Sequence, residues 1–212
     1  MRLAAGLALL ANLGSVAYVG KTWSSDMERS IAEATMAPVE AGKVGILVSP
    51  ADNSAQAKAE ARAAEDVIGN IIKRAQLGPF VVVRCVHPIF SEKQAQRLGQ
   101  RMRANIVVWQ SRLDSGLVDH HVTVLGANET AIDLEYLSLM LLMATQGTFT
   151  VSSPDLAGDD SGIIITNQVI APVAVGFVSL AVDRPVLAAM QFQRALGVEG
   201  IATTTARSLH DY

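Results

Sequence analysis

The chain has little of what most active sites are made from. Its 212 residues include one cysteine, Cys85, which excludes an intramolecular disulfide bond. It has no glycine-rich phosphate loop, no dinucleotide-binding fingerprint, no nucleophile elbow and no zinc-type spacing of cysteine and histidine. The sequence therefore predicts no cofactor, no metal and no catalytic set, and leaves open an activity that uses none of these motifs.

Charged and aromatic residues are also sparse, at 17% and 5% of the chain. With a net charge of −3 and basic residues spread along predicted helices, no nucleic-acid-binding surface is expected. Apolar residues are abundant instead, at 50% of the chain with a mean hydropathy of +0.31. A chain of this length can bury one sizeable core, so the excess of apolar residues suggests contact with a membrane.

The N-terminus, residues 1–23, is the first apolar segment. No charge occurs from residue 3 to residue 20, a length at the border between the apolar core of a signal peptide and a membrane span. Residues 15–17 are small enough for signal cleavage, but the bulky Tyr18 follows them. An uncleaved membrane anchor is the favoured interpretation, and a cleaved signal or a buried core helix are the alternatives.

The charges that flank this segment indicate its orientation. Arg2 precedes it and Lys21 follows it, a weak positive-inside signal that places the globular part in the periplasm or elsewhere outside the cytoplasm. Residues 24–42 mix charged and small apolar side chains. They are predicted to form an amphipathic linker that holds the domain away from the membrane.

Residues 43–151 are predicted to form an α/β domain. Apolar, β-branched runs predict four strands, and two helices follow the first two of them; the strands are 43–49, 80–86, 105–112 and 117–125, and the helices are 53–76 and 91–103. The first helix has one apolar stripe: Ala57, Ala61, Ala64, Ile68 and Ile71. Strands separated by helices are expected to be parallel, and a turn at 114–116 adds an antiparallel strand. The predicted fold is a βαβαββ mixed sheet with flanking helices.

The segments KVGILVSP, FVVVRCV, RANIVVWQSRL and LVDHHVTVLG, in this order, resemble the TolB amino-terminal-type domain. That βαβαββ fold is similar to the anticodon-binding domain of class II aminoacyl-tRNA synthetases. In the family the third strand commonly ends in tryptophan and glycine; here Trp109 matches, and Gln110 replaces the glycine. The resemblance implies an envelope-associated interaction module and brings no catalytic residues with it.

The chain beyond residue 126 is less regular. An apolar helix is predicted at 132–144, too short to span a bilayer and expected to pack on the sheet or on a partner. A short edge strand is predicted at 148–151, and a polar loop at 152–162. Residues 163–182 carry no charge and are long enough to cross a bilayer, but Asn167 and Gln168 would need hydrogen-bond partners in lipid. A core helix is therefore favoured over a membrane-spanning or membrane-surface helix.

The C-terminal segment, residues 163–212, is predicted to be a helical pair followed by a tail. The second helix should cover 186–196, and the spacing of Gly176, Ala188, Phe192 and Ala195 resembles a single tetratricopeptide repeat, in which small residues allow close helix packing. One repeat alone cannot form a stable solenoid. The exposed face of the pair is predicted to bind a partner protein. Its bulky anchors are expected to be Phe177, Met190 and Phe192.

Few residues suggest chemistry. Ser49, Cys85 and His87 follow or end predicted strands, where open α/β sheets often bind ligands, although a packed cysteine and a strand-end histidine are the commoner explanation. His120 and His121 are adjacent on a predicted edge strand. They should point to opposite faces, cannot chelate one ion together, and are expected to be exposed to solvent.

These observations favour a non-enzymatic, membrane-anchored interaction or scaffold subunit that binds other membrane or envelope proteins. This hypothesis rests on the absence of a catalytic set and on apolar helices that one small domain would struggle to bury. The alternative is a small-ligand-binding or enzymatic α/β domain that uses Ser49, Cys85 and His87.

Overall fold

The computed structural model describes residues 36–112, 118–125, 147–151 and 166–197. The chain divides into two units, 1–37 and 38–212, and the fold below belongs to the second. The predicted anchor, hairpin turn, 132–144 helix, 152–162 loop and C-terminal tail, with most of the linker, lie outside the described residues.

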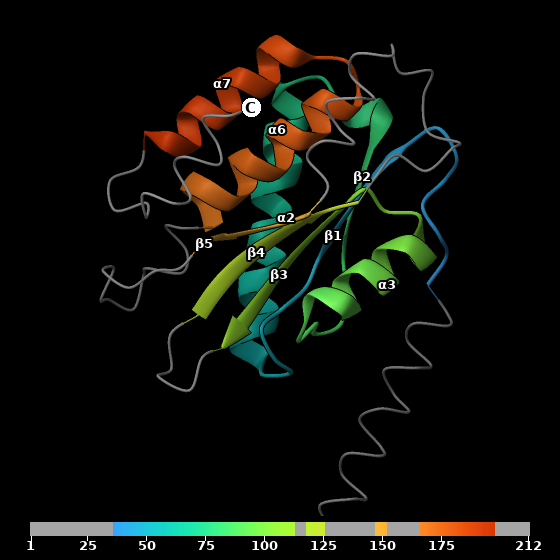
Figure 1. Cartoon of the computed structure of the whole chain (residues 1–212), viewed down its shortest axis with the longest axis vertical. Helices are drawn as coiled ribbons and strands as arrows, with labels where there is room; N and C mark the ends of the chain where they lie inside the picture. The colour runs from blue at the N-terminus through green and yellow to red at the C-terminus, as the bar shows by residue number, and fades with distance from the viewer. Residues whose placement is uncertain (1–35, 113–117, 126–146, 152–165, 198–212) are drawn as a thin grey trace, which may run out of the picture. The chain divides into compact units, whose positions relative to one another are not determined.

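A five-stranded mixed sheet in the order β2-β1-β3-β4-β5 forms the centre of the second unit (Figure 1). The strands are β1 (Val44–Val48), β2 (Val81–Cys85), β3 (Ile106–Arg112), β4 (Val118–Val124) and β5 (Gly147–Val151). β1 pairs in parallel with β2 and β3, whereas β4 is antiparallel to β3 and β5. The predicted parallel strands, antiparallel addition and short edge strand are confirmed.

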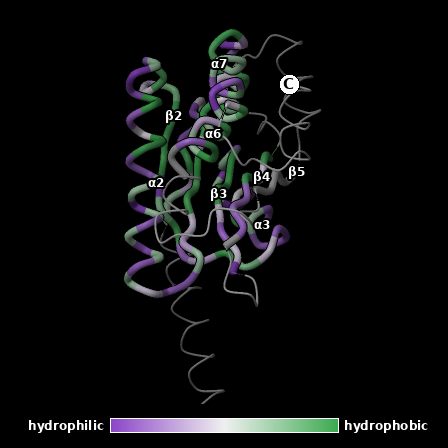
Figure 2. The backbone as a smooth tube through the Cα atoms, turned by 90° about the vertical axis from the view of Figure 1, so that its left-hand side faces the viewer, coloured by the Kyte–Doolittle hydropathy of each residue, from purple (hydrophilic) through white to green (hydrophobic). Residues whose placement is uncertain are grey.

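Helices cover both faces of the sheet. α2 (Ala55–Arg74) packs on one face with α6 (Ala171–Ala181) and α7 (Pro185–Leu196), while α3 (Glu92–Met102) lies on the other (Figure 2). Successive side chains of a strand point to opposite faces of the sheet, which explains the two layers. Ile46 and Val108 belong to the core shared with α2 and α6. Val107 points to the other face and lies close to α3, where a Cβ added at Gly99 would meet it.

The cap and the apolar stripe of α2 follow from its sequence. The Ser54 side chain accepts a hydrogen bond from Ala57 N at 3.1 Å and so caps the first turn. Four of the five predicted stripe residues are buried. The last buried position is Ile72, and Ile71 is half-buried because the stripe shifts around the helix as it continues.

α6 lies in the core, as predicted for residues 163–182. A π-helical turn, η2 (Thr166–Ile170), leads into it, and all eleven residues of α6 are buried. A helix that is apolar all round must be covered on every side, and the sheet, α2 and α7 supply that cover. In the part of the chain that the structure describes, no helix is both long and apolar enough to cross a membrane.

The contact between α6 and α7 corrects one prediction. Phe177 and Phe192 pack edge to face with ring centroids 5.2 Å apart, and they are only 2% and 3% exposed. A Cβ at Gly176 would lie 2.4 Å from the Phe192 ring, so this glycine makes the close helix approach possible. The expectation that the two rings lie on the exposed face of the pair is wrong, because both are buried in the interface between the two helices.

Candidate functional site

The strand ends that carry Ser49, Cys85 and His87 do come together. Val86 N donates to Val48 O at 2.8 Å, and Ser49 Oγ accepts a hydrogen bond from Ile89 N at 2.8 Å. The same hydroxyl lies 3.1 Å from His87 O, to which it can donate. Ser49 is buried, so its hydroxyl ties the end of β1 to the segment after β2.

Cys85 lies in β2 and is half-buried. Burial, with a further contribution from Glu65, raises the pKa of the Cys85 thiol to about 12. The thiol is therefore protonated at neutral pH, whereas reactive cysteines have a lowered pKa. Among the described residues, no three histidine, cysteine or acidic side chains converge to hold a metal ion.

The histidines of β4 are placed differently from the prediction. His120 and His121 are both buried: β4 is an interior strand of the sheet, and α6 and α3 contact it from the two faces toward which these side chains point. The expectation that they are exposed to solvent is wrong. They do point to opposite faces, since His120 Nδ1 lies 3.2 Å from Gln110 Nε2 while His121 stacks on Trp109 at 3.9 Å.

These contacts give both histidines structural partners. Burial lowers the pKa of His120 to about 4 and also lowers the pKa of His121. His121 Nε2 lies 2.8 Å from Ser111 Oγ, and Trp109 Nε1 donates to Thr123 Oγ1 at 2.9 Å. Gln110, which stands where the resembled family has glycine, is therefore one half of a buried pair across β3 and β4.

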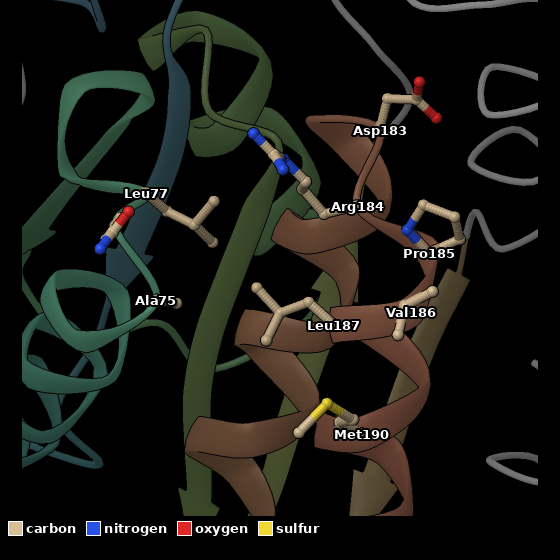
Figure 3. Close-up of a pocket in the computed structure, with 9 residues that line it drawn as sticks. Ala75, Leu77, Asp183, Arg184, Pro185, Val186, Leu187 and Met190 are labelled. Atoms are coloured by element: carbon tan, nitrogen blue, oxygen red, sulfur yellow. The ribbon is translucent and has the colours of Figure 1, made fainter.

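A hollow of about 470 Å³ lies between the end of α2 and the start of α7 (Figure 3). Leu187 and Met190 project toward it from α7, and Ala75 and Leu77 face it from the end of α2. Its remaining lining residues are Gln76, Asp183, Arg184, Pro185 and Val186. A volume of this size suits a bulky side chain or a short segment of a partner.

The surface beside the hollow is apolar. Val186 is 75% exposed and Met190 is 60% exposed, while Leu187 between them is half-buried. Met190 is the one predicted partner-binding residue that the structure places on the surface. Val186 and Leu187 were missed, although a helix that begins with Pro-Val-Leu lacks the polar first turn of an ordinary surface helix.

Charged groups border the same region. Asp183 and Arg184 are exposed at the start of α7 and line the hollow, and the exposed Gln76 adds a polar side chain from the α2 side. The backbone here is fixed, because Arg184 N donates to Ser179 O at 2.7 Å. The hollow thus combines apolar side chains with polar and charged groups, a mixture that is common in protein-binding sites.

No protein-family model, curated protein or solved structure matches the chain. Among the residues predicted to form a site, Ser49 is hydrogen-bonded to the main chain of His87, and Cys85 ends the neighbouring strand. Of the three predicted anchors, Met190 is exposed, whereas Phe177 and Phe192 are buried.

Proposed function

We propose that this protein is a non-enzymatic, membrane-anchored interaction subunit that binds another membrane or envelope protein at the hollow between α2 and α7. The observation that carries the proposal is the exposure of Val186 and Met190 beside a preformed hollow. The resemblance to the TolB amino-terminal-type domain and the uncharged N-terminal segment support the same class of function.

Energetics favour binding at this surface. Burial of a methionine or valine side chain contributes roughly 1.5–3 kcal/mol, so Met190 and Val186 together could supply much of a moderate affinity. Methionine also adapts its shape to irregular partners, since its side chain is unbranched and flexible. Arg184 at the border adds a donor that can fix the orientation of the bound segment.

The alternative function at the strand ends is less well supported. A nucleophilic site needs an activated group, but the Ser49 hydroxyl is occupied by main-chain hydrogen bonds and the pKa of Cys85 is raised to about 12. A ligand at that edge would have to displace contacts that hold β1 and β2 together.

Affinity purification of the full chain from its native membrane, followed by mass spectrometry, tests the proposal. We expect Met190→Glu to remove a partner that the wild type captures, because a carboxylate would enter an apolar contact. Ala189→Glu is the matched control, since Ala189 is an exposed neighbour that does not line the hollow. Equal capture by the wild type and both variants would contradict binding at this site.

The membrane part of the proposal has its own test. Deletion of residues 1–20 should move the protein into the soluble fraction, because these residues hold the uncharged run that we interpret as the anchor. Membrane association that persists in carbonate after this deletion would contradict the anchor and direct attention to residues 163–182.

A further inference from the structure

β2 is an end strand of the sheet, and among the described strands only β1 pairs with it. Because Val86 N donates to Val48 O, the main-chain groups of Val82 and Arg84 also face β1. The main-chain N–H and C=O groups of Val83 and Cys85 therefore point outward. An edge of this kind is a template for another strand unless charge or proline blocks it, and Arg84 is the one charged residue in β2.

We propose that the outer edge of β2 pairs antiparallel with β2 of a second copy of this chain, about a two-fold axis at Val83. The pairing is self-complementary. Val82 would lie opposite Arg84 of the partner, Val81 would lie opposite Cys85, and no like charges would face each other directly. The two sheets would join into one continuous sheet.

The flank of α2 above this edge fits the same axis. Glu65 lies near the Cys85 thiol, which places this side of α2 over the outer edge of β2. From Cys85 to Val83 the strand covers about 6.8 Å, the rise of four to five helical residues, so the axis should pass near Gly69. Gly69 is half-buried, and a Cβ added there would meet nothing within 4 Å.

Charge complementarity supports a second copy as the occupant. Glu65, Gly69 and Lys73 are spaced four residues apart and so form one stripe along α2. With Gly69 on the axis, Glu65 of each copy would lie opposite Lys73 of the other, and the glycine would let the helices approach closely. Phe80, 45% exposed just before β2, would add apolar surface. This inference uses a different surface from the hollow, so either proposal can fail without the other.

Light scattering on the full chain in detergent tests the pairing. The protein mass should be twice the 22.4 kDa of one chain. Val83→Pro should give a monomer with the fold intact, because it removes an N–H that points away from β1. Gly69→Glu should also give a monomer, whereas Asn70→Glu, an exposed neighbour on another side of α2, should remain dimeric.

Disulfide trapping gives a second readout that needs no loss of stability. In a Cys85→Ala background, Val83→Cys should cross-link the two copies on mild oxidation, since paired residues lie about 5.5 Å apart at Cα. Val82→Cys in the same background should not, because the two copies of that residue would be about 8 Å apart. A monomeric wild type, or a dimer unaffected by both Gly69→Glu and Val83→Pro and not trapped at position 83, would overturn the inference.

Discussion

The strand ends and the α2–α7 hollow differ in whether their side chains are engaged in the fold or exposed. At the strand ends, the Ser49 hydroxyl is hydrogen-bonded and the Cys85 thiol is held protonated. At the hollow, Val186 and Met190 are exposed, although burial of either side chain would be favourable. Ser49 and Cys85, which suggest chemistry in the sequence, have structural contacts here, and the surface that we propose for a partner exposes apolar side chains.

The largest expected effect contrasts two apolar residues of α7. Phe192→Ala should lower the free energy of unfolding by about 3–5 kcal/mol, because it removes the ring that packs on Phe177 and leaves a cavity beside Gly176. Met190→Ala should change it by less than about 0.5 kcal/mol, since that side chain is exposed. Urea unfolding followed by circular dichroism measures both, and similar losses would remove the distinction between buried and available apolar residues.

A pH dependence should come from His120. Its pKa is about 4 in the folded protein, below the ordinary value, so between about pH 6.5 and pH 4 the unfolded chain binds a proton that the folded chain does not. Stability is therefore full above this window and should fall by roughly 3 kcal/mol as the pH drops through it. His121 should add to the loss in the same direction.

The matched variant for this effect is His120→Gln, which keeps a hydrogen-bonding side chain near Gln110 but cannot be protonated. Its unfolding free energy should vary less with pH over the same window than that of the wild type. Equal pH slopes in the two proteins would show that His120 is not the buried neutral group described here.

A smaller effect is expected at the strand ends. Ser49→Ala should cost about 1–3 kcal/mol of stability, because Ile89 N would lose its buried acceptor. If Ser49 instead serves a ligand site, its loss should affect binding more than stability. Chemical denaturation of the wild type and the variant distinguishes these outcomes, and an unchanged midpoint would contradict the structural role of this hydroxyl.

The sequence predicts the sheet well because its strands have simple local signals. β1, β2 and β3 are short β-branched runs, and the intervening helices carry N-terminal serine caps at Ser54 and Ser91. Parallel pairing then follows from the helical crossovers. The α/β class and the burial of α6 could both be predicted on these grounds.

The errors arise where a residue's surroundings come from distant parts of the chain. His120 and His121 are polar and look exposed in isolation, but α3 covers one face of β4 and α6, which begins more than forty residues later, covers the other. Likewise, apolar residues occur all round α6, so periodicity cannot show that Phe177 faces Phe192 instead of a partner. The exposure of Val186 and the hollow beside it depend on how α2 and α7 meet.

Site-specific photo-cross-linking in the native membrane tests the central claim most directly. A benzoylphenylalanine placed at Met190, which lines the hollow, should cross-link to a discrete protein partner, and the same group at Lys93 of α3, on the other face of the sheet, should not. Ala189→Glu should leave the cross-link at position 190 intact. Cross-linking at position 93 but not at position 190, or no protein adduct at position 190 under conditions where the group is photoactive, would contradict partner binding at the α2–α7 hollow.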